Sequence, residues 1–275
     1  MNFEEHAAKP LLRTAGIETP RGVLAHSAEE AAQAAKQLGP CVVKAQVATG
    51  KRGKAGGIRL AADPEAARAA ANAILGMSIG EHRVEKLLVE EQVAFAREMY
   101  AAVLDDPASK GPLLLFSAEG GMDIEEIAAK HPDALVRLPA DIRTGLDARL
   151  LDGALPASLP CDRAALAGLL DRLFRVYVES DAELLEINPL VVARDGRLVA
   201  LDCKLVIDDS ALPRHQELAK SGQHFLRHLC QAHVNVFQSK ALLEPHEHAV
   251  LFGRIAVRGD IPFSRLSMAA RLRYV

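Results

Sequence analysis

The stretch Val42–Gly57 reads VVKAQVATGKRGKAGG, a short apolar run that opens into a glycine-rich, cationic loop. The apolar run carries Lys44, and the loop contains four glycines and three further cations. Glycine lets the main chain approach an anion closely, and lysine and arginine neutralise its charge. The stretch therefore predicts a strand followed by a polyphosphate-binding loop, although a basic surface loop would carry the same residues.

The sequence lacks the two commonest nucleotide-binding patterns. It contains neither the P-loop pattern GxxxxGK[ST] nor a GxGxxG fingerprint after a strand. If the chain binds phosphates, strand lysines and a lid have to hold them, which is a different architecture from either of those folds.

Length and composition are those of a globular protein with one large domain or two small ones. The 275 residues are 49% hydrophobic and 25% charged, and the net charge of −3 argues against a nucleic-acid binder. No apolar run reaches the length of a membrane span, and the N-terminus has acids where a secretory signal would be basic. Four separated cysteines favour a reducing compartment, so we expect a bacterial cytoplasmic protein, with the mitochondrial matrix as an open alternative.

Strands are expected in hairpins as well as between helices, which favours an α+β fold with mixed or antiparallel sheets. Capping patterns at Asn2/Glu5, Ser27/Glu30, Asp63-Pro64, Asp123 and Asp162 predict five helix starts. Between them, β-branched and alternating runs predict the following strands: 22–26, 41–47, 58–61, 86–91, 98–105, 113–118, 183–193 and 197–203. Residues 139–160 give a mixed signal and no prediction.

The second informative stretch is Leu184–Lys204, which reads LLEINPLVVARDGRLVALDCK. Antiparallel pairing about the turn at 194–196 would place Asn188 and Asp202 across from each other. A carboxylate and an amide oxygen are hard ligands that suit Mg²⁺, which shares its other positions with water and substrate phosphates. The alternative is a hairpin with polar residues on its wet face, and the phosphate-type loop elsewhere favours the metal.

Five segments in order resemble the succinyl-CoA synthetase β-subunit family, whose nucleotide-binding part is an ATP-grasp fold. They are EEHAAKPLLRTAGIETP, VVKAQVATGKRGKAGG, LLVEEQVAFAREMY, FSAEGGMDIEEIA and LLEINPLVV with its partner GRLVALDCKLVIDD. The resemblance covers about residues 3–209. It implies an ATP-grasp domain over 1–209, made of two α+β subdomains, with the smaller, lid-like one at about 20–95.

The resemblance also implies a set of nucleotide contacts. Lys44 matches the strand lysine that reaches the phosphates. Lys51, Arg52 and Gly53 match the family's glycine-arginine-glycine phosphate loop, with lysine in place of the first glycine.

Further positions follow from the same resemblance. Glu90 and Val93 match positions that contact adenine and the hinge, and Glu98 matches an acidic residue facing the nucleotide. Asn188 and Asp202 match the Mg²⁺ ligands, in agreement with the hairpin argument.

In this family, phosphate passes between ATP or GTP and a histidine of a partner α subunit, which also carries the CoA site. Glu186 matches a glutamate that steadies the phosphohistidine loop, and we expect it to be the catalytic residue of this chain. The expected function is therefore the nucleotide-binding β subunit of an NDP-forming acid–CoA ligase, with succinate as the default acid. The alternative is an ATP-grasp remnant that binds nucleotide or an α-type partner without completing ligation.

The resemblance fades after Asp209, where the composition also changes. From Ser210 to Val275 there are nine Lys/Arg against four Asp/Glu, and six of the ten histidines. We therefore expect residues 210–275 to be a divergent or truncated C-terminal tail. His224, His228, Cys230 and His233 are close enough for a zinc site, but a helix with scattered histidines is the favoured interpretation.

Overall fold

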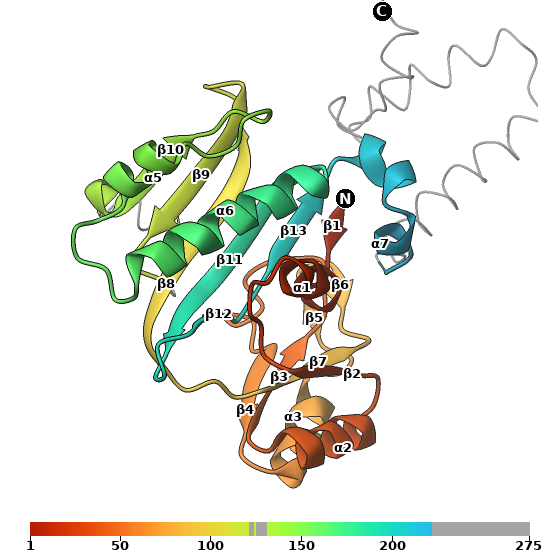
Figure 1. Ribbon diagram of the computed structural model, residues 1–275. Helices are drawn as coiled ribbons and strands as arrows, with labels where there is room; N and C mark the ends of the chain where they lie inside the picture. Colours follow the sequence, from red (N-terminus) through yellow and green to blue (C-terminus); the bar gives the residue numbers. More distant parts are fainter. Residues whose placement is uncertain (121–123, 125–130, 222–275) are drawn as a thin grey trace, which may run out of the picture. The chain divides into compact units, whose positions relative to one another are not determined.

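The computed structural model describes residues 1–120, 124 and 131–221 (Figure 1). The helix predicted at Asp123 lies outside this range, as do His224, His228, Cys230 and His233 of the tail. Residues 2–207 form one compact unit, and Met1 with residues 208–221 belongs to a second. The second unit contains a 3₁₀ helix, Asp209–Arg214, and α7, Gln216–Ser221.

A seven-stranded sheet forms the larger layer of the first unit. Its path runs β1 (Asn2–Phe3), β13 (Lys204–Ile207), β11 (Ala182–Ala193), β8 (Phe95–Asp106), β9 (Gly111–Ser117) and β10 (Leu135–Pro139). The seventh strand, β12 (Leu198–Ala200), pairs with β11 beside this path. Every pairing between these named strands is antiparallel, which confirms the α+β class.

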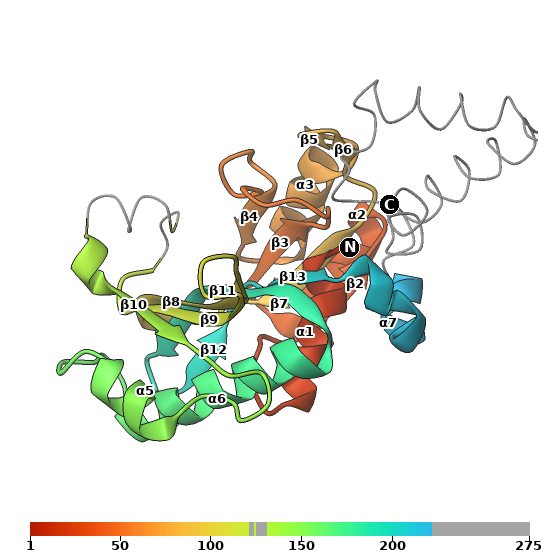
Figure 2. The same cartoon turned by 90° about the horizontal axis from the view of Figure 1, so that it is seen from above.

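Three helices cover one face of this sheet (Figure 2). They are α1 (Glu5–Thr14), α5 (Ala148–Ala154) and α6 (Arg163–Glu179). On α6 the predicted apolar face is buried, namely Leu166, Leu169, Leu170, Leu173, Phe174 and Tyr177. This stripe at helical spacing packs on β8 and β11, so the longest helix of the described residues lies on their two longest strands.

A second, four-stranded antiparallel sheet has the order β2 (Gly22–Ala25), β7 (Leu87–Glu91), β3 (Cys41–Ala45) and β4 (Ile58–Ala61). Its core is shared with α2 (Ala28–Leu38) and α3 (Pro64–Ile74), whose buried faces are mostly alanine. Small side chains allow the helices to pack closely on the sheet. A short hairpin of β5 (Ser78–Ile79) and β6 (His82–Arg83), which the sequence did not predict, adds Ile79 to this core.

Local capping chemistry starts three helices as predicted. The side chains of Ser27, Asp63 and Asp162 accept hydrogen bonds from the backbone N–H three residues later, at 3.1, 2.8 and 2.7 Å. Each bond satisfies a donor that the first turn of a helix leaves unpaired.

The capping box predicted at Asn2 is wrong. Asn2 lies in β1 opposite Val206, and α1 has Glu4 at its N-cap with no side-chain capping bond. Glu5 is instead a buried member of the site described below. The helix runs through Pro10 without a restart, contrary to the interruption that proline favours.

A short helix fills part of the stretch without a prediction. Asp147 caps α5 by accepting from the N–H groups of Arg149 and Leu150 at 2.8 and 3.1 Å. Among the described residues, no helix combines the length and apolar character needed to cross a bilayer.

Candidate functional site

A pocket of about 460 Å³ lies between the loop that follows β3 and the hairpin part of the large sheet. Lys51 and Arg52 line it from the loop, and Glu186, Asn188 and Asp202 line it from the hairpin. The two segments that the sequence predicted to share a site therefore meet at one pocket, although about 130 residues separate them in the chain.

The hairpin register places Asn188 and Asp202 as predicted. Leu190 pairs with Ala200 in β11–β12, and Glu186 pairs with Lys204 in β11–β13. The same register across the intervening residues sets Asn188 opposite Asp202. Both side chains belong to the pocket wall.

The predicted return strand 197–203 is too long, because the ladder is interrupted at Leu201–Cys203 between β12 and β13. The Leu201 N–H still donates to the Pro189 carbonyl at 3.1 Å. The Leu201 carbonyl instead accepts from the ammonium groups of Lys9 and Lys44, at 2.8 and 2.6 Å. Charge-assisted hydrogen bonds thus replace the ladder at this point.

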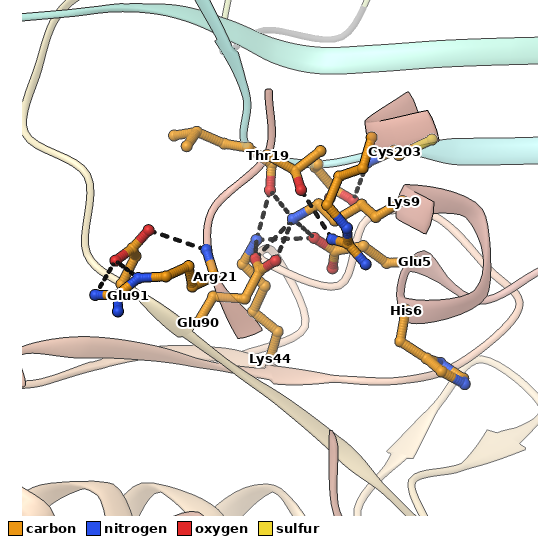
Figure 3. A network of polar contacts seen from close by, with 12 residues as sticks. Glu5, His6, Lys9, Thr19, Arg21, Lys44, Glu90, Glu91 and Cys203 are labelled. Atoms are coloured by element: carbon orange, nitrogen blue, oxygen red, sulfur yellow. Dashed lines mark hydrogen bonds and ion pairs between the residues drawn. The ribbon is translucent and has the colours of Figure 1, made fainter. Parts of the chain in front are cut away.

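Beside the pocket, six charged side chains form what we call the charge cluster: Glu5, Lys9, Lys44, Arg52, Glu90 and Asp202. They come from α1, β3, the loop, β7 and the hairpin. Figure 3 shows Glu5, Lys9, Lys44 and Glu90 converging on one another. Three are cations and three are carboxylates, so the cluster is balanced when all are ionised.

Lys44 has every donor of its ammonium occupied. The group contacts Glu5 Oε1 at 2.9 Å, Glu90 Oε2 at 2.7 Å and the Leu201 carbonyl at 2.6 Å. A lysine ammonium has three N–H donors. Lys44 is buried and is not among the described residues that line the pocket. To bind a phosphate directly, it would have to exchange one of these partners.

Arg52 is paired with the residue predicted to bind the metal. Its Nη2 lies 2.6 Å from both carboxylate oxygens of Asp202 and 2.8 Å from Glu5 Oε2. Its Nη1 donates to the Ala45 carbonyl at 2.9 Å. In this structure the expected phosphate ligand and the expected metal ligand therefore neutralise each other.

Burial and pairing act against each other on the pKa values of the cluster. Burial alone would raise the pKa of Glu5, but Lys44, Lys9 and Arg52 outweigh it and hold that pKa well below its ordinary value. Burial lowers the pKa of Lys44, yet Glu5 and Glu90 raise it overall. For Glu90, burial and the nearby Glu5 carboxylate prevail over the lysines, and the pKa is raised.

The loop itself holds a conformation that its sequence does not favour at one position. Lys51 is exposed and has a φ of 63°, in the left-handed region where glycine is the favoured residue. An added Cβ at Gly53 would meet only Ile58, at 3.8 Å. At Gly57 it would lie 2.6 Å from Ile79 and 3.2 Å from the Arg52 carbonyl, so this glycine is needed for packing.

Three predicted nucleotide contacts do not meet at this pocket. The carboxylate of Glu90 belongs to the charge cluster, and Val93 packs against a group of buried residues that includes Val191 and Val199. Glu98 is half-buried on β8, opposite Val191. None of the three is among the described residues that line the pocket, so their roles stay predictions.

Sequence reasoning missed Glu5 and Lys9 as members of the site. The only local signal was the spacing of Glu5 and Lys9 in the segment EHAAK, an i,i+4 pair on a helix, and the two do pair at 2.7 Å. Such pairs usually lie on an exposed helix surface, whereas both of these side chains are almost fully buried.

Comparison with known proteins gives a consistent answer. The sequence profile of the ATP-grasp domain family matches residues 2–192. The chain is 46% identical over 222 residues to a protein of Rubrobacter xylanophilus named succinate–CoA ligase [ADP-forming] subunit beta. It is 45% identical over 224 residues to the corresponding GDP-forming protein of Thermus thermophilus. These matches confirm the resemblance inferred from the sequence.

The match covers 80% of this chain but only 58% and 59% of those two relatives. The chain thus spans less than two thirds of the length of the curated relatives that it matches.

Solved structures confirm the fold. An acetyl-coenzyme A synthetase from Ca. Korarchaeum cryptofilum superposes with a TM-score of 0.63 at 22% identity, over 75% of this chain and 93% of that one. An ATP citrate lyase from Methanothrix soehngenii gives a TM-score of 0.64 at 25% identity, over 80% of this chain and 54% of that one. The family match, the relatives and the architecture agree, and the chain belongs to the ATP-grasp domain family.

Proposed function

We propose that this chain supplies the nucleotide site of an NDP-forming acid–CoA ligase, as the β subunit or part of it. The observation that carries the proposal is the pocket at which the cationic glycine loop meets the Asn188–Asp202 hairpin. The names of the relatives, succinate–CoA ligases, support the reaction class. Relatives of nearly equal identity are ADP-forming and GDP-forming, so the proposal covers ATP and GTP equally.

Asn188 and Asp202 fit a magnesium ion. Both line the same pocket and carry side-chain oxygen atoms, and Mg²⁺ takes few protein ligands and fills its other positions with water and phosphate. Bound there with the nucleotide, the ion would neutralise charge on the phosphates. On binding the ion, Asp202 would exchange its contact with Arg52, which would free the guanidinium to contact the phosphates.

The residues of this chain would act by positioning and charge neutralisation and would form no covalent bond with the substrate. Lys51 and Arg52 would hold phosphate oxygens. Glu186, on the pocket wall opposite Lys204 in the ladder, would contact the phosphohistidine segment of an α-type partner subunit.

A second candidate is a binding module that takes up nucleotide without passing phosphate on. The observation that favours it is that Lys44 and Arg52 are already paired with carboxylates of the chain itself. Mixing the chain with an α-type subunit, Mg²⁺ and ATP labelled at the γ-phosphate separates the two. Labelled histidine on the partner supports the ligase subunit, and binding without labelling supports the module.

Nucleotide binding itself is tested by titration calorimetry with Mg–ATP and Mg–GTP. Asp202→Ala is expected to weaken Mg–nucleotide binding by roughly 10- to 100-fold, the usual worth of a charge-assisted contact. Asp195→Ala is the matched control, because Asp195 is an exposed carboxylate at the turn of the same hairpin and pairs with Arg197. Equal affinities of both variants and the parent chain would contradict the proposed site.

A further inference from the structure

Glu5 contacts more cations of the site than any other described carboxylate of the charge cluster. Its Oε1 lies 2.7 Å from Lys9 and 2.9 Å from Lys44 (Figure 3). Its Oε2 lies 2.8 Å from Arg52. The side chain has 0% exposure. One carboxylate therefore joins a helix, a strand and the phosphate-type loop.

The arrangement fixes the spacing of two cations. Lys44 comes from β3 and Arg52 from a loop rich in glycine, so neither element sets the position of both groups. The two oxygens of a carboxylate have a fixed separation, and Glu5 uses one for each cation. Lys9, one turn further along α1, holds the carboxylate in place and also bonds Glu90 at 2.6 Å.

A purely stabilising role explains this arrangement poorly. Removing charges from water cancels much of the attraction within a buried ion pair, so apolar side chains of similar size would stabilise the fold about as well, although removing one partner alone is costly. Holding charged groups ready in a fixed geometry is, by contrast, the main way in which proteins stabilise phosphate charge.

We propose that Glu5 is a positioning residue of the nucleotide site, which holds Lys44 and Arg52 at a set spacing for the phosphates while each cation exchanges one of its other partners for a phosphate oxygen. The proposal rests on the proposed function, because it needs the pocket to bind a nucleotide. Glu5 is also among the residues that line the pocket, but in this account it acts through the two cations and not by contact with the nucleotide.

The direction of the effect of Glu5→Gln separates positioning from simple charge. The substitution removes one negative charge from a balanced cluster, so attraction alone would make a phosphate bind more tightly. If Glu5 positions the cations, Mg–ADP instead binds roughly 10- to 100-fold more weakly. Adenosine, which has no phosphates, is expected to bind the variant and the parent chain equally.

Glu4→Gln is the matched control. Glu4 neighbours Glu5 in the sequence and is mostly buried, but it pairs with Lys86 at 2.7 Å, outside the charge cluster. The Glu4→Gln variant loses the same charge at nearly the same place. Its affinity for Mg–ADP is expected to stay within about twofold of that of the parent chain, because Glu4 touches no group of the charge cluster.

A double variant controls for a loss of folding in Glu5→Gln. Glu5→Gln with Lys9→Met removes one charge of each sign and keeps the cluster balanced, and weaker Mg–ADP binding is expected here too. The Glu5→Gln substitution is also made in a Lys44→Met background. If Glu5 acts through Lys44, Glu5→Gln weakens Mg–ADP binding less in that background than in the parent chain. A merely structural Glu5 would give the same loss in both backgrounds.

The outcomes are distinct. If the parent chain binds no Mg–nucleotide, the proposed function fails, and the role of Glu5 fails with it. If the parent chain binds and the folded Glu5 variants bind Mg–ADP as tightly or more tightly, only the positioning role is overturned. Weaker Mg–ADP binding with adenosine and Glu4→Gln unaffected supports it.

Discussion

Lys44 and Arg52 are buried members of the charge cluster, although Arg52 also lines the pocket, whereas Lys51 is exposed on the pocket wall. All three belong to one short stretch that the sequence assigns to phosphate binding. The buried pair is held by carboxylates from three other elements, while Lys51 has a strained backbone. Equal charge in a sequence motif therefore does not mean an equal role, because burial decides which cations must exchange partners before they bind a ligand.

The largest expected difference between the two regions is in stability. Lys44→Met leaves Glu5 and Glu90 close together with one cation fewer, and breaking a buried pair in this way costs about 3–5 kcal/mol. Lys51→Met removes an exposed charge and should change the free energy of unfolding by less than about 0.5 kcal/mol. Urea unfolding of both variants measures the contrast. Equal losses in the free energy of unfolding would show that Lys44 is not paired with Glu5 and Glu90 in solution.

The pH dependence of stability sharpens the same contrast. The folded pKa of Glu5 is depressed, so its contribution is complete above the ordinary value of 4.5 and is lost as the pH falls through the depressed pKa. Glu5→Gln should be less stable than the parent chain by about 3 kcal/mol at pH 7, and the gap should narrow below that ordinary value.

Glu29→Gln provides the control for this pH series, because Glu29 is an exposed residue of α2. Its unfolding curve should follow that of the parent chain at every pH. A gap for Glu5→Gln that stays constant on acidification would mean that the carboxylate is not held ionised by its three cations.

Two glycines of the loop should respond differently to alanine. Gly57→Ala forces a Cβ to within 2.6 Å of Ile79 and 3.2 Å of the Arg52 carbonyl. We expect a loss of about 1–3 kcal/mol in the free energy of unfolding, typical of overpacking. Gly53→Ala has ordinary contacts only and should change stability by less than about 1 kcal/mol. Thermal unfolding of the two variants would contradict the loop conformation if Gly53→Ala were the more damaging.

The smallest expected effect is a gain in stability. Lys51→Gly relieves the left-handed backbone at this position and should stabilise the chain by up to about 1 kcal/mol, less the entropy that glycine loses on folding. The same variant should bind Mg–nucleotide more weakly, because it removes a cation from the pocket wall. Greater stability with unchanged affinity would remove Lys51 from the phosphate site.

Local chemistry explains what the sequence could predict. Ser27, Asp63 and Asp162 cap helices through bonds that span three residues, and the turn at 194–196 sets the register that brings Asn188 opposite Asp202. Both depend on neighbours in the chain and on periodicity, which a sequence displays directly.

Long-range pairing explains what it could not predict. Asn2 resembled a helix cap but pairs with Val206, which is far away in the sequence. Lys44 was recognised as a cation, yet its burial depends on Glu5 and Glu90 from two other elements. No local pattern shows which carboxylate a lysine will meet after folding.

A crystal structure of the chain with Mg²⁺ and ADP would test the central claim most directly. The account predicts the metal on oxygen atoms of Asn188 and Asp202, with Arg52 turned from Asp202 toward the phosphates. A nucleotide bound in this pocket with Arg52 still on Asp202, or a nucleotide bound elsewhere in the chain, would contradict it.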